Sequence, residues 1–304
     1  MQRTSTSTAA LHRAATGLAL SIGLATGSAT ELLATAAPTL DLLARPSTQD
    51  ADDDAPDTEP AEAEDVADVP WEARRADDDE HMLYHLIGHD PEADAPDDGY
   101  RLLVVLPGGD GQAGFRDFVR RIRAYALDEE WIVAQLVAPV WGEDQEVVWT
   151  SDELPHDEME FTTGEFIAAV IDEVEAEIAV DPKFVFAMGW SSSGTEVYRA
   201  ALEKKTKVTG AFVAMSVWKP DLLPTLRYAE DRAFSILHSP DDFIPIRMAE
   251  DAQDELEEAE ARVHFATYQG GHGWRDDPYG NMRRAIAFLE ENHADPPKRK
   301  KKKR

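Results

Sequence analysis

A serine stands where a predicted strand turns into a predicted helix. The apolar segment 184–188 has strand character, and the segment 195–202 is rich in helix-forming residues. Between them lies Ser191, two residues after a glycine. A strand, a sharp turn and a helix are the context in which a serine hydroxyl is held ready for nucleophilic attack. The spacing therefore predicts a nucleophile elbow.

The choice among three adjacent serines rests on sterics. An elbow needs small residues two positions before and two positions after the nucleophile, because the turn is strained and neighbouring segments approach closely. Gly189 and Ser193 meet this requirement around Ser191. Centring the turn on Ser192 would place Trp190 where a small side chain is needed. We therefore predict Ser191 as the nucleophile.

A general base and an acid are predicted at two later strand ends. A serine hydroxyl is a weak nucleophile at neutral pH and needs a base that a third group orients. The predicted strand 233–238 is followed by Asp241 and Asp242, and the strand 263–268 runs into a glycine-rich loop with His272. The order serine, acid, histidine is the one that α/β hydrolases use. We predict that His272 takes the proton of the serine and returns it to the leaving group.

Residue counting leaves the identity of the acid open. Counting forward from His238 favours Asp242, whereas counting back from Pro245 favours Asp241. The acid's expected role is to hold the imidazole in the productive tautomer and to stabilise the imidazolium. The other aspartate would then be a turn residue ahead of the next helix.

An oxyanion site requires two backbone N–H donors that are already in place. One is expected from Ser192, directly after the nucleophile, and the other from Gly109 in the loop after the predicted strand 100–107. A phosphate-binding role for this glycine loop is disfavoured, because no lysine follows and Asp110 would repel a phosphate. The loop is thus expected to stabilise negative charge on a carbonyl oxygen.

Strands and helices alternate along the chain, which predicts an α/β fold with a mostly parallel, twisted sheet and helices on both faces. Thr162 and Glu165 are spaced as a capping box at the start of one helix. In the helix 115–127 the cations Arg120, Arg121 and Arg123 are expected to face outward. The predicted strands are 81–89, 100–107, 131–137, 184–189, 210–217, 233–238 and 263–268, and the other helices are 162–178, 195–202, 246–261 and 281–292.

The segment 138–160 has turn residues and no clear period, yet it contains Trp141 and Trp149. Packing against the sheet is the default interpretation of its apolar side chains, and a cap over a substrate pocket is the alternative.

Three histidines recur every four residues at His81, His85 and His89. This spacing suits a metal site on a helix, but the segment has strand composition and no nearby cysteine or carboxylate completes a ligand set. We predict ordinary strand residues and no metal.

The two ends of the chain differ from its middle. Segment 1–36 has a basic start, a short apolar run and small residues, which favours a secretory signal over an organelle transit peptide. Segment 37–70 is acidic and predicted to be a disordered linker. A hydrolase domain is expected over 71–293, followed by a basic disordered tail over 294–304. These features predict a secreted or periplasmic protein.

Charge and cysteine content narrow the function. The formal net charge is −30, so the surface should repel nucleic acid and anionic membranes, and the apolar run near the start is too short for an integral membrane span. The absence of cysteine excludes disulfides and thiol catalysis. The oligomeric state is not indicated.

Four motifs resemble a known family. From about residue 84 to 289 the sequence resembles the phospholipase/carboxylesterase and dienelactone-hydrolase branch of the α/β-hydrolase family, and it is similar to polyhydroxybutyrate-depolymerase-like and feruloyl-esterase-like secreted esterases. The motifs are Leu106 to Gly111, Gly189 to Gly194, His238 to Asp242 and Tyr268 to Trp274. Related sequences commonly end the acid turn in Ser-Pro-x-Asp, so the resemblance implies Asp242. It departs from the family at Pro107, where most relatives have histidine, and at Ser193, where they have glycine.

The resemblance implies the α/β-hydrolase fold and a serine esterase that cleaves small or polymeric carboxylic esters through an acyl-enzyme, without a metal or cofactor. Trp190, Asp110 and Trp274, which lie close in sequence to the predicted catalytic groups, are expected to line the substrate pocket. The alternatives are a peptidase or thioesterase on the same scaffold, or a binding protein that kept the fold without catalysis. The acyl and alcohol groups are not indicated.

Overall fold

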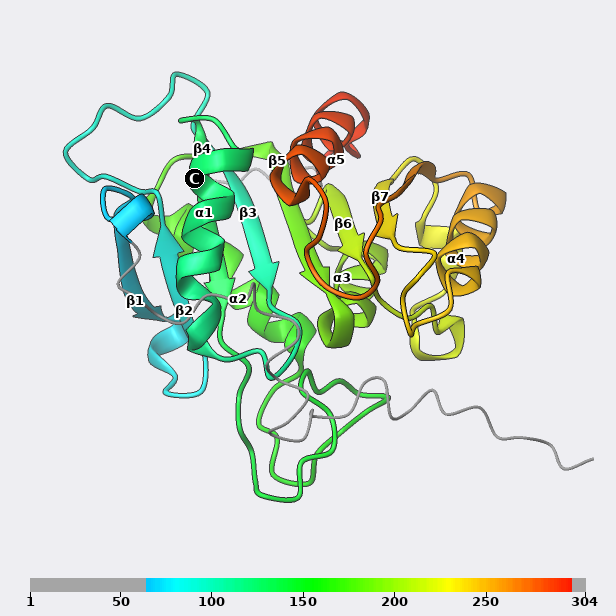
Figure 1. Ribbon diagram of the computed structural model, residues 1–304. Coiled ribbons are helices and arrows are strands. Elements are labelled where there is room, and N and C mark those ends of the chain that lie inside the picture. The colour runs from blue at the N-terminus through cyan, green and yellow to red at the C-terminus, as the bar shows by residue number, and fades with distance from the viewer. Residues whose placement is uncertain (1–63, 297–304) are drawn as a thin grey trace, which may run out of the picture. The chain divides into compact units, whose positions relative to one another are not determined.

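A single eight-stranded sheet organises the chain (Figure 1). The computed structural model describes residues 64–296. The strands lie in the order β1-β2-β4-β3-β5-β6-β7-β8, with antiparallel pairing of β2 to both of its neighbours and parallel pairing from β4 onward. The strands are β1 Trp71–Arg75, β2 Leu83–Ile87, β3 Tyr100–Leu106, β4 Trp131–Leu136, β5 Val180–Trp190, β6 Gly210–Ala214, β7 Ala233–His238 and β8 Arg262–Thr267.

Helices cover both faces of this sheet. In Figure 1, α1 and α5 lie in front of the strands, and α2 and α3 lie behind them. None of the helices in the described chain is both long and apolar enough to cross a membrane. The helices are α1 Arg116–Ala126, α2 Thr163–Glu177, α3 Gly194–Leu202, α4 Arg247–Glu258 and α5 Pro278–Asn292, and the short 3-10 turns are η1 Glu64–Val66, η2 Ala76–Asp78, η3 Ala113–Phe115, η4 Ser191–Ser193, η5 Pro220–Leu222 and η6 Leu226–Tyr228.

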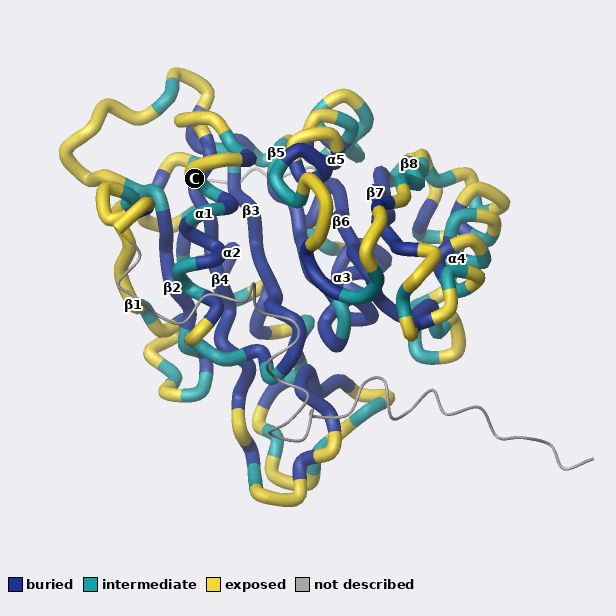
Figure 2. Tube along the Cα trace, viewed as in Figure 1, coloured by how far each residue is buried: buried dark blue, intermediate teal, exposed yellow. Residues whose placement is uncertain are grey.

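Two hydrophobic cores lie on opposite sides of the sheet. One core packs α2, α3 and α4 against the strands through residues such as Phe166, Val197 and Leu256. The other packs α1 and α5 through residues such as Phe118 and Leu289. Figure 2 shows the central strands buried between helices whose outer sides are exposed. Because these strands are buried on both faces, their sequences are continuous apolar runs and do not alternate between apolar and polar residues.

The predicted architecture is confirmed. A mostly parallel sheet with helices on both faces, with an antiparallel strand pair at one edge, is the arrangement of the α/β-hydrolase fold. The predicted capping box is present as well: the Thr162 hydroxyl accepts from the Glu165 amide at 3.2 Å, and the Thr162 amide donates to the Glu165 carboxylate at 2.9 Å. This exchange satisfies donors that would otherwise be unpaired at the start of α2.

One strand was not predicted from the sequence. β1 lies at the edge of the sheet, pairs only with β2, and exposes Trp71, Glu72, Ala73 and Arg75. Its mixed and charged composition gives no alternation of apolar and polar residues, so no strand signal could be read from it.

The start of the described chain corrects one expectation about α1. Residues that precede the predicted domain start at Trp71 accept hydrogen bonds from arginines of α1. Arg120, expected to face outward, is only 8% exposed, because its guanidinium donates to the carbonyl oxygens of Val66 and Val69. Segment 64–70 therefore covers part of α1. The predictions for residues 1–63 and 297–304 lie outside the described residues.

The segment 138–160 contains no helix or strand, as expected, yet several of its side chains are buried. The indole Nε1 of Trp149 donates to the Pro107 carbonyl at 3.0 Å, and the Ala138 amide donates to the Gly111 carbonyl at 2.9 Å. Both acceptors belong to the loop that follows β3. The segment therefore packs against this loop and supports it from one side.

Candidate active site

Ser191 occupies a strained turn at the carboxyl end of β5. Its φ angle is +53°, in the left-handed region that non-glycine residues rarely adopt. The preceding Trp190 still has extended geometry, and the 3-10 turn η4 leads directly into α3. This is the strand, sharp turn and helix that the sequence predicted around Ser191. Such strain at a single residue is a common feature of functional sites.

Close packing around the turn explains why small residues flank the serine. A Cβ atom placed on Gly189 would lie 2.6 Å from the Ser193 Oγ and 2.7 Å from the Val197 Cγ2. Real Cβ atoms do not approach other atoms so closely. Ser193 itself is fully buried, with its hydroxyl bonded to the Leu106 carbonyl and to the Trp190 backbone. A serine at this position thus fits the interior.

A continuous hydrogen-bonded line joins three side chains from three strand ends. His272 Nε2 lies 3.0 Å from Ser191 Oγ, and His272 Nδ1 lies 2.9 Å from each carboxylate oxygen of Asp242. The Asp242 side chain has no exposed surface, and that of His272 is 10% exposed. The geometry suits a tautomer in which Nδ1–H donates to the carboxylate and Nε2 accepts from the serine hydroxyl.

The structure places Asp242, and not Asp241, against the histidine. Asp242 Oδ1 also accepts from the Ile244 amide at 2.8 Å, which fixes the carboxylate in position. Asp241 is exposed, and its amide donates to the Ser239 hydroxyl as part of the turn. Sequence counting had left these two residues undecided, because both lie within the same short turn.

A second histidine beside the acid was not singled out from the sequence. His238, at the end of β7, is fully buried, and its Nε2 lies 2.9 Å from the Ile244 carbonyl and 4.0 Å from Asp242 Oδ2. Burial lowers the pKa of His238, which favours its neutral form. With His238 neutral, the Asp242 carboxylate is left to stabilise the positive charge that His272 acquires when it takes a proton.

Glycines and anchoring hydrogen bonds fix the loop that carries His272. Gly271 and Gly273, on either side of it, have φ angles of +78° and +104°, which favour glycine. The Gly271 amide donates to the Ser239 hydroxyl at 3.1 Å, and the Tyr268 hydroxyl donates to the Gly271 carbonyl at 2.8 Å. The histidine loop is thereby tied to the acid turn.

The two predicted oxyanion residues lie next to each other. The Ser192 hydroxyl donates to the Gly109 carbonyl at 3.0 Å, so the residue after the nucleophile is joined to the loop after β3. Gly109 has a φ angle of +58°. Neither its amide nor that of Ser192 donates one of the backbone hydrogen bonds found outside the helices and strands of the described residues. Gly109 and Ser192 stay the predicted oxyanion donors.

The three residues predicted to line a pocket have different environments. Asp110 is half-buried and accepts from the Gln112 amide at 3.0 Å. Trp190 is fully buried and Trp274 is 9% exposed, and their rings pack together with centroids 5.5 Å apart. A fully buried indole offers no surface to a ligand. The pocket role of Trp190 stays a prediction that its burial argues against.

An exposed aromatic ring beside the histidine was missed in the sequence. Phe243 is 66% exposed, and its ring centroid lies 4.4 Å from that of His272. Its position directly after Asp242 was the only signal available. Because large apolar side chains are usually buried, an exposed phenylalanine packed against this imidazole is a candidate contact for an apolar substrate group.

Comparison with solved structures supports the assignment of the fold. A thermostable esterase matches over 75% of this chain and 64% of its own, with 19% identity and a TM-score of 0.54. The fold is that of the α/β hydrolases. Esterase 2 of Thermogutta terrifontis, phosphorylated by paraoxon, matches over 74% of this chain and 95% of its own, with 16% identity and a TM-score of 0.53.

A carboxylesterase of Bacillus cereus matches over 74% of this chain and 95% of its own, with 15% identity and a TM-score of 0.52. The chain spans less than two thirds of the length of the thermostable esterase. Identities this low establish the fold alone. No protein-family model matches the chain, and no curated protein matches it.

Proposed function

We propose that the protein is a serine hydrolase that cleaves carboxylic esters through an acyl-enzyme. One observation carries the proposal: Ser191, His272 and Asp242 form an unbroken hydrogen-bonded line with bonds of 2.9 to 3.0 Å. The esterase names of the neighbouring structures support the same reaction class.

The first half of the reaction forms the acyl-enzyme. Ser191 Oγ attacks the ester carbonyl carbon while His272 Nε2 takes the hydroxyl proton. The carbonyl oxygen becomes an oxyanion, which we expect the amides of Gly109 and Ser192 to bind; one such donor is worth about 2.7 to 4 kcal/mol. The bond from the carbonyl carbon to the alcohol oxygen then breaks, and Nε2 returns its proton to the departing alcohol.

The second half repeats these steps with water. Nε2 takes a proton from a water molecule, whose oxygen attacks the acyl carbon. The bond to Ser191 Oγ then breaks, the serine recovers its proton, and the carboxylic acid leaves. In both halves Asp242 orients the imidazole and stabilises its positive charge. The proton transfer between Ser191 Oγ and His272 Nε2 therefore takes place between atoms that are 3.0 Å apart.

An activity-based label tests the proposal directly. Treatment of the purified protein with a fluorophosphonate probe should add one label at Ser191, and a short-chain p-nitrophenyl ester should be hydrolysed. Both signals should disappear in Ser191→Ala and remain in Ser216→Ala, whose hydroxyl bonds the Ser191 carbonyl but not the catalytic line. A folded wild-type protein that takes no label would indicate a binding protein that kept the fold.

A structural neighbour suggests organophosphates as a second class of reagent for labelling Ser191. Thermogutta terrifontis esterase 2 is phosphorylated by paraoxon, and we expect an organophosphate to react in the same way with Ser191. Matched ester, thioester and peptide substrates would then rank the reaction types. If the thioester or the peptide is turned over faster than the oxygen ester, the result would favour a thioesterase or a peptidase over an esterase.

We also propose export, from the basic, then apolar, then small-residue order of segment 1–36. Intact mass measurement of protein recovered from the periplasm or medium should show removal of this segment. A full-length protein retained inside the cell would contradict it.

A further inference from the structure

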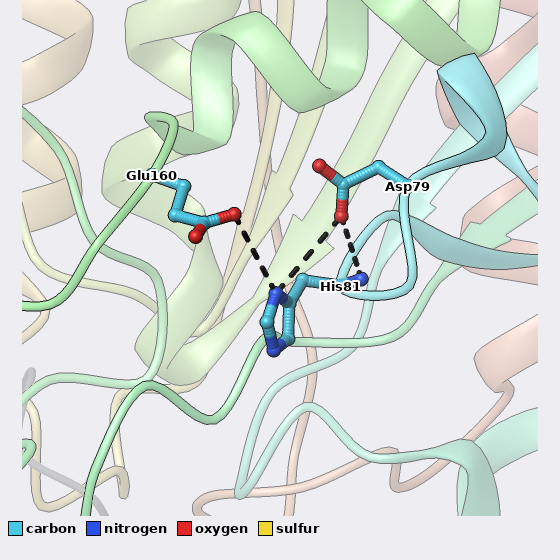
Figure 3. Close-up of side chains that lie close together, drawn as sticks. All are labelled: Asp79, His81 and Glu160. Carbon is cyan, nitrogen blue, oxygen red and sulfur yellow. Dashed lines mark hydrogen bonds and ion pairs between the residues drawn. The ribbon is translucent and has the colours of Figure 1, made fainter.

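Three side chains with metal-binding atoms meet away from the catalytic line (Figure 3). Asp79 follows η2, His81 precedes β2, and Glu160 ends the segment 138–160. His81 Nδ1 lies 3.9 Å from Asp79 Oδ1 and 3.9 Å from Glu160 Oε2, and one donor atom of each residue lies within 4.8 Å of the others. Figure 3 shows the imidazole pointing between the two carboxylates.

The imidazole nitrogen in this cluster lacks a hydrogen bond. His81 Nδ1 is buried and has no hydrogen-bond partner among the described residues, although two carboxylates face it. At 3.9 Å both oxygens are too distant to accept from it. Buried polar atoms in folded proteins nearly always have a partner. A ligand between the three groups would supply one.

Other contacts already hold two of the side chains in place. Asp79 Oδ1 accepts from the His81 amide at 2.8 Å, which orients the carboxylate. The imidazole packs against the Trp141 ring with centroids 5.0 Å apart. The donor atoms thus converge without bonding directly to one another. The Glu160 side chain, which is 66% exposed, can adjust its position.

We propose that Asp79, His81 and Glu160 bind one divalent transition-metal ion of the zinc type. Bonds of about 2.0 to 2.2 Å to nitrogen and oxygen place two tetrahedral ligand atoms of one ion about 3.4 Å apart, so the two separations of 3.9 Å would each shorten by about 0.5 Å on binding. Two carboxylates balance the charge of the ion. The imidazole favours zinc over calcium and magnesium, which take oxygen ligands.

The site would join two segments that are distant in the sequence. Asp79 and His81 lie just before β2, whereas Glu160 lies just before the Thr162 cap of α2. The same segment 138–160 supports the loop after β3 through Trp149. The role of the ion is therefore structural, and the catalytic line of Ser191 needs no metal for its chemistry.

Zinc titration of the full-length protein, treated with a chelator and dialysed, tests the site. In a calorimetric titration, the binding isotherm should have its inflection at one Zn²⁺ ion per protein molecule. Thermal denaturation should shift upward by roughly 5 to 10 °C at a Zn²⁺ concentration 100-fold above the dissociation constant. Ca²⁺ and Mg²⁺ should give neither effect. An equal response to Ca²⁺ would overturn the assignment to a transition metal.

Variants distinguish zinc binding at this site from unspecific zinc binding to the acidic surface of the protein. His81→Ala and Glu160→Gln should each lose the stoichiometric binding and the thermal shift. His89→Gln, another of the three evenly spaced histidines, should keep both. Circular dichroism checks that each variant folds. If His81→Ala unfolds, Glu160→Gln still tests the site, because it keeps the imidazole, whose side chain is 37% exposed. Absence of zinc binding in the wild type, or wild-type binding in Glu160→Gln, would overturn the proposal.

Discussion

The Ser193 hydroxyl donates a 2.6 Å hydrogen bond to the Leu106 carbonyl, and so connects the elbow to the end of β3. The same oxygen accepts from the Trp190 amide at 2.9 Å. Leu106 is the last residue before the loop that contains Gly109. This buried side chain therefore helps to hold the nucleophile close to the predicted oxyanion donors, together with the bond from the Ser192 hydroxyl to the Gly109 carbonyl.

Replacing Ser193 by alanine should reduce both stability and turnover. The change leaves buried backbone groups without a partner, which should lower the free energy of unfolding by about 1 to 3 kcal/mol. A displaced oxyanion loop should also reduce kcat by roughly 10- to 100-fold. Urea denaturation and ester hydrolysis measure the two effects. Ser235→Ala, which removes another buried hydroxyl bonded to His264, should lose stability but keep kcat. Equal kcat values in both variants would refute the coupling.

The two adjacent aspartates should differ sharply in their effect on catalysis. Asp242→Asn should lower kcat by roughly 10⁴-fold, because asparagine favours the unproductive tautomer of the histidine. Asp241→Asn should stay close to the wild type, since the Asp241 side chain is exposed and lies outside the catalytic line. Steady-state kinetics on one ester give both values. A larger loss in Asp241→Asn would reassign the acid.

A buried carboxyl group in α3 should make the stability depend on pH. Glu196 is 2% exposed, and its Oε2 lies 3.0 Å from Arg199 Nε. Burial raises the pKa of Glu196 to about 7, although Arg199 acts in the opposite direction. Below about pH 4.5 both the folded and the unfolded states hold the proton. Between about pH 4.5 and 7 the unfolded chain ionises first, so stability falls as the pH rises.

Glu196→Gln should remove this dependence. The wild type should lose up to about 3 kcal/mol of unfolding free energy, relative to the variant, as the pH rises from 5 to 8. Denaturant unfolding at several pH values measures the difference. Glu203→Gln, at the exposed end of the same helix, should follow the wild-type curve. A wild-type stability that rises over this range relative to Glu196→Gln would show that Arg199 keeps the group ionised.

Phe243 should influence substrate choice more than stability. Its ring is 66% exposed and packs against His272 at an interplanar angle of 43°, so truncation to alanine removes apolar surface next to the reacting atoms. We expect KM for esters with large apolar groups to rise several-fold, while KM for acetate esters changes little. A comparison of acyl chain lengths measures this effect. Tyr125→Ala removes an exposed ring on α1 and should leave both KM values unchanged. The same KM change across all chain lengths would argue against an apolar contact.

Much of the fold was predictable because each element carried a local signal. The strand 100–107 is a continuous apolar run, and the Thr162 to Glu165 pair marks the start of α2. The elbow was predictable from sterics alone, since Gly189 has no room for a side chain. β1 was not, because an exposed strand with charged residues lacks the pattern on which strand prediction depends.

The remaining features depend on contacts between distant parts of the chain. The burial of Arg120 follows from segment 64–70, and the support that Trp149 gives to the loop after β3 spans 42 residues. The sequence also gave no reason to pair His81 with Glu160. Spacing rules describe neighbours on one element, so they could not find groups that only the folded sheet brings together.

The charged composition of β1 also affects how the protein behaves at high concentration. A sheet edge presents unpaired N–H and C=O groups to which a strand of another molecule can add. β1 is short, and its Glu72, Arg74 and Arg75 place charges along that edge. An added strand would have to desolvate these charges. This edge therefore opposes the growth of intermolecular sheets, and concentrated solutions should resist aggregation until β1 is displaced.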